Sequence, residues 1–176
     1  MKPVKVGICG LGTVGGGTLN VLKRNAEEIT RRAGRGIEVA QIAIRSPKPQ
    51  YDTTGITLTS DVFDVVNNPE IDIVIELMGG IEPARGYLLE AINSGADVVT
   101  ANKALLATHG PVIFDAADQV GAQVYYEASV AGAIPIIRPL RDSLAGDRVQ
   151  RIMGIVNGTT NFILDKMDAE HLTLEA

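Results

Sequence analysis

The stretch Val6-Gly7-Ile8-Cys9-Gly10-Leu11-Gly12-Thr13-Val14-Gly15 decides the fold. It joins a β-branched run, Val4 to Cys9, to a segment with apolar side chains at helical spacing, Val14 to Arg32. Glycines in the pattern G-x-G-x-x-G between a strand and a helix permit a tight turn, close approach of a pyrophosphate, and close helix-strand packing. The stretch therefore predicts a dinucleotide-binding turn. A glycine turn without any ligand is the alternative.

Strands and helices alternate along most of the remaining chain. Strands are expected at 38–44, 71–77, 97–101 and 123–126, and helices at 60–66, 85–94 and 111–120. Right-handed crossovers between parallel strands then predict a Rossmann-type α/β fold, doubly wound, with a mainly parallel sheet and helices on both faces. The pattern changes to a helix at 134–140 and a strand at 150–156. We expect an NAD(P)-binding domain at 1–133 and the first elements of an incomplete second α+β domain at 134–176.

Composition limits the possible partners. The chain of 176 residues has 16 basic and 21 acidic residues, and its net charge of -5 opposes broad electrostatic binding to nucleic acid or anionic membranes. Its apolar runs are shorter than the ~20 residues needed to span a bilayer. A single cysteine, Cys9, cannot form an internal disulfide, and no secretory signal opens the chain. We expect a cytoplasmic protein that binds a small molecule, with no nucleic acid or membrane partner.

The second predicted strand ends in Ile44-Arg45-Ser46, at the position where NAD-preferring domains usually carry an acidic residue. A guanidinium at this position can pair with a ribose 2′-phosphate, and Ser46 and Lys48 could assist. The sequence therefore predicts a preference for NADP(H), with NAD(H) as a possible second cofactor. A solvated surface arginine is the alternative for Arg45.

Small residues follow the strand that opens the second half of the sheet. Met78, Gly79 and Gly80 would lie at the switch point of strand order, where a flat nicotinamide ring can be admitted. Glu76 lies near the end of the same apolar strand. Its carboxylate could be functional or could cap a neighbouring helix or loop, and we leave it out of the predicted site.

Lys103 is the predicted catalytic residue. Thr100-Ala101-Asn102-Lys103 ends the next strand at the same edge of the sheet, so the ammonium group could point into the cleft. A protonated lysine is suited to donating a proton to the alkoxide formed when a hydride reaches a carbonyl. A solvated lysine at a strand end is the alternative, and its position and residue type do not decide between the two.

Glu127 heads a loop of small residues that continues to Pro135. A carboxylate and several carbonyl oxygens suit a hard cation, whereas a carboxylate at a helix N-terminus is an equally simple reading. His109, expected in a loop, and His171 have no companion ligands at useful spacing and read as surface residues. Cys9 lies inside a predicted strand and reads as a packing residue, which argues against an acylating aldehyde dehydrogenase.

With these segments laid out, the chain resembles homoserine dehydrogenase. The most specific matches are Thr100-Ala101-Asn102-Lys103, Tyr126 to Pro135, and Gly154-Ile155-Val156-Asn157-Gly158-Thr159-Thr160-Asn161. The resemblance implies interconversion of L-homoserine and L-aspartate 4-semialdehyde with NAD(P)(H), in the biosynthesis of threonine, methionine and isoleucine. The family continues through a substrate and dimerisation domain, so the resemblance also implies a homo-oligomer for the full-length protein.

The same resemblance assigns roles to individual residues. Lys103 matches an active-site lysine, and Gly158 lies at the junction of cofactor and substrate. A sodium ion would be coordinated by Glu127, Val130, Gly132 and Ile134. Together with the residues derived above, the expected cofactor-binding set is Gly10, Leu11, Gly12, Thr13, Val14, Gly15, Arg45, Met78, Gly79, Gly80, Thr100, Lys103 and Gly158.

Two further expectations concern activity. The chain stops where the family continues, so we expect it to bind cofactor but to turn over little or no homoserine, because substrate positioning supplies much of a rate enhancement. The alternative to an enzyme is a non-catalytic dinucleotide sensor, since a Rossmann domain alone only binds. An apolar strand at 150–156 would also favour pairing with a second copy.

Overall fold

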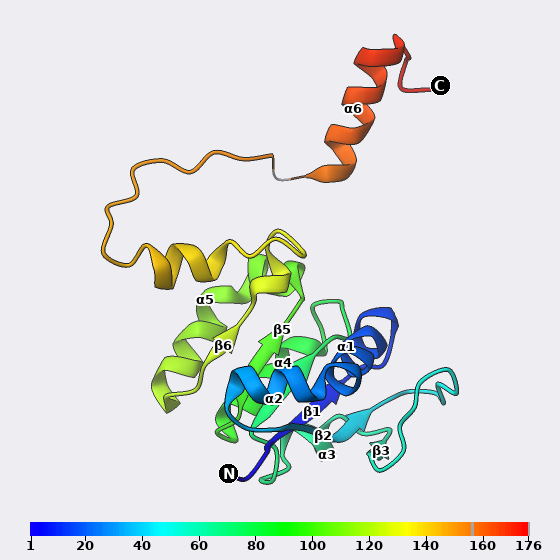
Figure 1. Cartoon of the computed structure of the whole chain (residues 1–176), viewed down its shortest axis with the longest axis vertical. Coiled ribbons are helices and arrows are strands. Elements are labelled where there is room, and N and C mark those ends of the chain that lie inside the picture. Colours follow the sequence, from blue (N-terminus) through cyan, green and yellow to red (C-terminus); the bar gives the residue numbers. More distant parts are fainter. Residues whose placement is uncertain (156, 176) are drawn as a thin grey trace. The chain divides into compact units, whose positions relative to one another are not determined.

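A six-stranded parallel sheet runs through the first part of the chain (Figure 1). The computed structural model describes residues 1–155 and 157–175, and the sheet has the order β3-β2-β1-β4-β5-β6. This order reverses beside the first strand, as in dinucleotide-binding doubly wound folds, so the predicted fold class is confirmed. The strands are β1 (Val4–Cys9), β2 (Ile37–Ala43), β3 (Thr57–Thr59), β4 (Ile73–Glu76), β5 (Asp97–Thr100) and β6 (Val124–Tyr125).

Helices cover both faces of the sheet. Side chains alternate along β1, so that Val4, Val6 and Ile8 join one core cluster and Cys9 joins the other. The first cluster includes Leu19 of α1 (Thr13–Arg24). The second cluster includes side chains from α3 (Phe63–Val66), α4 (Ala84–Asn93) and α5 (Lys103–Val120). None of the described helices is long and apolar enough to cross a membrane.

Two local differences from the sequence analysis lie in the first half of the chain. The helix expected at 14–32 is divided at Asn25 into α1 and α2 (Ala26–Ala33). Asparagine favours such breaks because its side chain competes with helical hydrogen bonding. The strand β3 is not predicted from the sequence, because its three residues show too little periodicity to be recognised.

The helix expected at 111–120 begins earlier, at Lys103. The Asn102 side chain caps it by accepting a hydrogen bond from the Leu105 N–H at 3.1 Å. Pro111 lies inside α5, so the prediction that His109 lies in a loop is wrong. A proline lacks only one backbone donor, and the buried side chains of this helix hold it against the sheet despite that loss.

The short helix expected at 60–66 begins at Phe63, and Ser60 does not cap it. Its neighbour Asp61 accepts a hydrogen bond from the Phe63 N–H at 2.9 Å and satisfies the first turn of α3 instead. Carboxylates and hydroxyls are both good hydrogen-bond acceptors at helix starts. Which of the adjacent residues Ser60 and Asp61 accepts the N–H group therefore depends on the local backbone.

Contacts divide the chain into two compact units, Met1–Gly132 and Ala133–Ala176. In the second unit, a π-helix at Pro139–Ser143 replaces the helix expected at 134–140, and α6 spans Gly158–Glu170. Residues 150–155 form no strand, so that prediction is wrong for them, and Val156 lies outside the described residues. A strand needs a hydrogen-bonded neighbour, and no described residue of this unit is in a strand. Pairing with a second copy stays a prediction.

Candidate functional site

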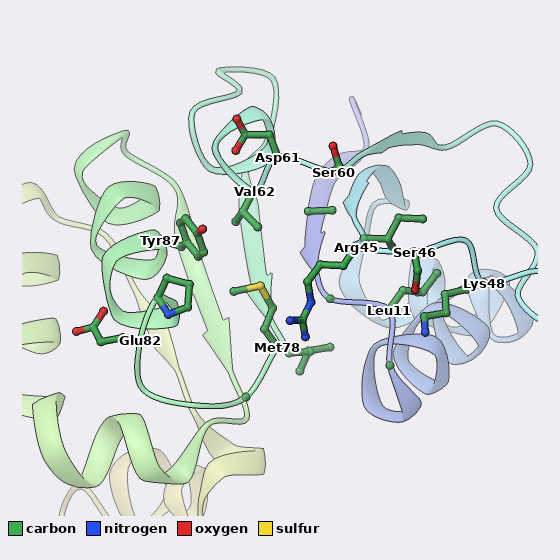
Figure 2. A pocket seen from close by; sticks show the side chains of 17 residues that line it. Leu11, Arg45, Ser46, Lys48, Ser60, Asp61, Val62, Met78, Glu82 and Tyr87 are labelled. Carbon is green, nitrogen blue, oxygen red and sulfur yellow. The ribbon is translucent and has the colours of Figure 1, made fainter.

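A cavity of about 610 Å³ lies in the first unit, at the carboxyl ends of β1, β2 and β4. Doubly wound sheets bind their ligands at this edge. Figure 2 shows its lining, to which β1, β2 and β4 each contribute the residues that follow them. The lining residues are Gly10, Leu11, Gly12, Ala43, Ile44, Arg45, Ser46, Lys48, Ser60, Asp61, Val62, Leu77, Met78, Gly79, Glu82, Pro83 and Tyr87.

The glycine turn forms one wall of this cavity. Gly10 has φ of 100°, a conformation that side-chain-bearing residues rarely adopt. A Cβ added at Gly15 would lie 2.0 Å from the Gly10 carbonyl oxygen, so this close packing requires glycine. Gly12 has open space where a side chain would be, and α1 begins immediately after it, with Thr13, Val14 and Gly15 in its first turn. The free N–H groups of that turn are suited to an anion beside the cavity.

Cationic and hydroxyl side chains form the wall beyond β2. Arg45 points into the cavity, and Ser46 and Lys48 lie on the same side of it (Figure 2). Two acidic residues, Asp61 and Glu82, also line the cavity. Each is engaged locally: Asp61 accepts the Phe63 N–H, and Glu82 forms an ion pair with Arg85 at 2.5 Å. The cations of this wall are therefore available to an anionic ligand.

The loop that carries Lys48 is anchored to α1. Lys23 forms an ion pair with Asp52 at 2.7 Å, and this hydrogen bond holds the pKa of the Asp52 carboxyl well below its usual range. The Tyr51 hydroxyl lies 3.4 Å from the Gly12 carbonyl oxygen. A Cβ added at Gly16 would lie 1.9 Å from the Tyr51 ring. No local sequence pattern predicts these anchors, because they join residues that lie 29 to 39 positions apart.

Glu76 holds the turn on the opposite wall. This side chain is 2% exposed, and its Oε1 accepts hydrogen bonds from the N–H groups of Met78, at 2.8 Å, and Gly79, at 3.3 Å. The sequence left open whether the Glu76 carboxylate is functional or caps a neighbouring helix or loop, and the structure shows that it caps the loop after β4. Met78 and Gly79 line the cavity. Gly80 is not among the lining residues, and its carbonyl oxygen accepts a hydrogen bond from Asn102 Nδ2 at 2.5 Å.

Thr100 differs from its expected role. Its side chain has no exposed surface, its hydroxyl donates to Glu76 Oε2 at 2.8 Å, and its carbonyl accepts from the Ser129 hydroxyl at 2.7 Å. Thr100 therefore supports the site from inside the protein, and the expectation of direct cofactor contact is corrected. Burial of a threonine cannot be read from a short strand pattern alone.

Lys103 is exposed and is the first residue of α5. It does not line the cavity, but it follows β5, which pairs with β4 in a register that places Thr100 opposite Glu76. The loops after β4 and β5 therefore leave the sheet at the same edge. Gly158, the first residue of α6, belongs to the second unit.

The remaining candidates lie outside the cavity. Glu127 begins a short 3₁₀ helix, Glu127–Ser129, and Gly132 has φ of 60°. No group of three His, Cys, Asp or Glu side chains among the described residues could hold a metal ion. Burial, and then the neighbouring charge of Glu76, raise the pKa of Cys9 to about 12. This thiol is therefore protonated at neutral pH and is no nucleophile.

Two models of one protein family match most of this chain. The family model described as "Homoserine dehydrogenase, NAD binding domain" matches residues 10–127, and the model described as "Homoserine dehydrogenase" matches residues 135–176. The chain is 61% identical to homoserine dehydrogenase of Pseudomonas aeruginosa over 167 residues, which are 95% of this chain. It is 42% identical to the enzyme of Bacillus subtilis over 172 residues.

Solved structures agree. The structure of a homoserine dehydrogenase from Thiobacillus denitrificans superposes with a TM-score of 0.90 at 55% identity, over 97% of this chain and 40% of that one. A hyperthermophilic archaeal homoserine dehydrogenase in complex with NADPH superposes with a TM-score of 0.82 at 27% identity, over 99% of this chain and 59% of that one. The chain spans 38% of the length of the Pseudomonas relative. The NAD-binding family model alone matches more than half of the 176 residues, and the chain belongs to the homoserine dehydrogenase family.

Proposed function

We propose that the chain is the cofactor-binding part of an NADP(H)-dependent homoserine dehydrogenase, which interconverts L-homoserine and L-aspartate 4-semialdehyde. The observation that carries this proposal is the convergence of the glycine turn, Arg45 and the Met78-Gly79 turn on one cavity at the switch point of the sheet. From the family resemblance we also propose that the full-length protein is a cytoplasmic homo-oligomer and that its substrate is a small molecule.

The lining residues fit a phosphorylated dinucleotide. The N-terminal turn of α1 and the unobstructed Gly12 suit a pyrophosphate. Arg45, Ser46 and Lys48 offer charged and hydroxyl donors to a 2′-phosphate, and residues 44–51, which directly follow β2, include no acidic residue that would favour an unmodified ribose. The relative described as a complex with NADPH supports this choice.

Arg45→Ala should weaken NADPH binding selectively. Loss of a charge-assisted hydrogen-bond pair costs about 1.5–3 kcal/mol, which corresponds to roughly 10- to 100-fold in Kd. NADH has no 2′-phosphate, so its Kd should change by less than about twofold. Titrations of the purified chain, followed by nicotinamide fluorescence, measure both constants.

Arg35 provides the matched control for this experiment. It is also exposed but precedes β2, and therefore lies at the opposite edge of the sheet. Arg35→Ala removes the same charge and should leave both Kd values unchanged. Equal losses of NADPH affinity in the two variants would show that Arg45 acts only through the net charge of the chain and not through contact with the 2′-phosphate. Equal binding of NADPH and NADH by the unmodified chain would overturn the cofactor preference.

Lys103 is proposed as the proton donor and acceptor at the substrate oxygen. When bound, the nicotinamide cofactor supplies or accepts the hydride. The lysine ammonium can give a proton to the oxygen of the aldehyde as it becomes a hydroxyl, and the neutral amine can remove that proton in the reverse direction. The exposed position of Lys103 beyond β5 supports this role, because the side chain can reach a substrate at the carboxyl edge of the sheet.

We also propose that Glu127, Val130, Gly132 and Ile134 bind sodium. The first three lie at the end of the first unit, where one carboxylate and a turn with Gly132 at positive φ offer oxygen ligands of the kind that hard cations prefer. Ile134 belongs to the second unit, so its inclusion depends on the family resemblance alone.

Sodium should therefore stabilise the folded chain. A concentration tenfold above Kd would contribute about 1.4 kcal/mol, measured as a higher Tm in NaCl than in choline chloride of equal ionic strength. Glu127→Ala should abolish this difference, whereas Glu27→Ala, at an exposed carboxylate of α2, should keep it. The same Tm in both salts for the unmodified chain would argue against the site.

A further inference from the structure

A buried polar network connects the two loops that leave the sheet after β4 and β5. Glu76, Thr100, Asn102 and Ser129 are each at most 9% exposed, and they are four of the five buried polar or charged residues in the described part of the chain. Burying a carboxylate among apolar side chains is costly unless its oxygens are hydrogen-bonded. An apolar residue at position 76 would avoid this cost, so the carboxylate must provide something that packing does not.

The first link of the network shapes the cofactor cavity. Glu76 Oε1 accepts the N–H groups of Met78 and Gly79, both of which line the cavity. Gly79 and the next residue, Gly80, have φ of 74° and 77°. Consecutive residues in this conformation turn the chain sharply and have no side chains to hold them by packing. The carboxylate therefore supplies the contacts that fix this turn from behind.

The second link reaches α5. Glu76 Oε2 accepts the Thr100 hydroxyl at 2.8 Å, and the same hydroxyl oxygen accepts the Asn102 N–H at 3.0 Å. Asn102 then uses both ends of its amide: Nδ2 donates to the Gly80 carbonyl, and Oδ1 caps the first turn of α5. The network is closed, because it starts from the Met78-Gly79-Gly80 turn and returns to it.

Lys103 follows Asn102 directly and is the first residue of the capped helix. The Asn102 cap fixes the backbone at the start of α5, and the Lys103 side chain extends from this backbone. We propose that Glu76 is a positioning residue, which sets the Met78-Gly79 turn and, through Thr100 and Asn102, fixes this turn relative to the start of α5. This inference rests on the proposed function, since it assigns the turn to the nicotinamide half of the cofactor.

Binding of the two halves of the cofactor can be measured independently. 2′-Phospho-ADP-ribose carries the adenosine, 2′-phosphate and pyrophosphate groups but no nicotinamide. NADPH carries all of them, and its fluorescence reports the environment of the nicotinamide. Glu76→Gln keeps the size of the side chain but replaces one acceptor oxygen with a donor, so the Met78, Gly79 and Thr100 donors can no longer all be satisfied.

We expect Glu76→Gln to weaken NADPH binding about tenfold and to reduce the fluorescence enhancement of bound NADPH at saturation. The Kd of 2′-phospho-ADP-ribose should change by less than about twofold. Thr100→Val has the same shape without the hydroxyl, and should give the same selective loss because it cuts the link between Glu76 and Asn102. This second variant keeps the test decisive if Glu76→Gln does not fold.

Gln41→Met provides the control for a merely structural effect. Gln41 is also a buried polar residue of the sheet, 8% exposed, and accepts a hydrogen bond from Asn68 Nδ2 at 2.8 Å. Its loss should lower Tm without changing the ratio of the two Kd values. Equal weakening of both ligands in Glu76→Gln and Thr100→Val, or unchanged NADPH binding and fluorescence, would overturn the inference. Failure of the unmodified chain to bind either ligand would instead overturn the proposed function, and the inference with it.

Discussion

Lys103→Ala is expected to lower kcat for homoserine oxidation by roughly 10²- to 10⁴-fold, the range that general acid-base groups contribute. The measurement is NADP⁺-dependent oxidation of L-homoserine by an enzyme that contains this chain. The alcohol must lose its proton as its hydride leaves, and Lys103 is the candidate base at the edge of the sheet where β4 and β5 end. Water would replace the lysine poorly because it has no fixed position.

Binding should be nearly unaffected in the same variant. The cavity lining does not include Lys103, so the Kd of NADPH should change much less than kcat. Lys2→Ala, at an exposed lysine near the start of the chain, should retain both the rate and the Kd of NADPH. A decrease in kcat of tenfold or less in Lys103→Ala would contradict the proposed acid-base role and would identify Lys103 as a solvated side chain.

Gly15→Ala is expected to have the largest effect on stability. Its new Cβ would lie 2.0 Å from the carbonyl oxygen of Gly10 and 3.0 Å from the carbonyl carbon. Both atoms belong to the backbone, so the contact cannot be relieved by moving a side chain. Overpacking of this kind costs typically 1–3 kcal/mol, about a 5- to 150-fold change in the unfolding equilibrium. The displaced turn should also lose most of its NADPH affinity.

Gly17→Ala is the matched control for this prediction. Gly17 lies in the same helix, α1, and has no atom within 4 Å of an added Cβ. Alanine is the better helix former, so this change should stabilise the chain by about 0.5–1 kcal/mol. Urea unfolding and NADPH titration measure both variants. If the Gly15 and Gly17 variants had equal stability, the turn would not require the close contact that the structure shows.

Much of the cofactor site can be predicted from local sequence. The glycines of Gly10 to Gly15 identify their turn because a strand and a helix flank them, and flanking periodicity is a local property. The position of Arg45 after the second strand is likewise local, and the structure places both features at one cavity. The start of α5 was misplaced because Gly110-Pro111 resembles a helix break, whereas the capping contact of Asn102 depends on the folded backbone.

The sequence by itself determined the Rossmann fold, the family, and the dinucleotide turn. Only the tertiary structure decided the role of Glu76, the burial of Thr100 and the anchoring of Tyr51. Glu76 and Thr100 are 24 residues apart, and their hydrogen bond exists because β4 pairs with β5 in one register. Tyr51 and Gly12 are 39 residues apart and meet only when the loop after β2 folds onto α1. Local propensities act over a few residues, so contacts created by strand pairing leave no periodic pattern in the sequence.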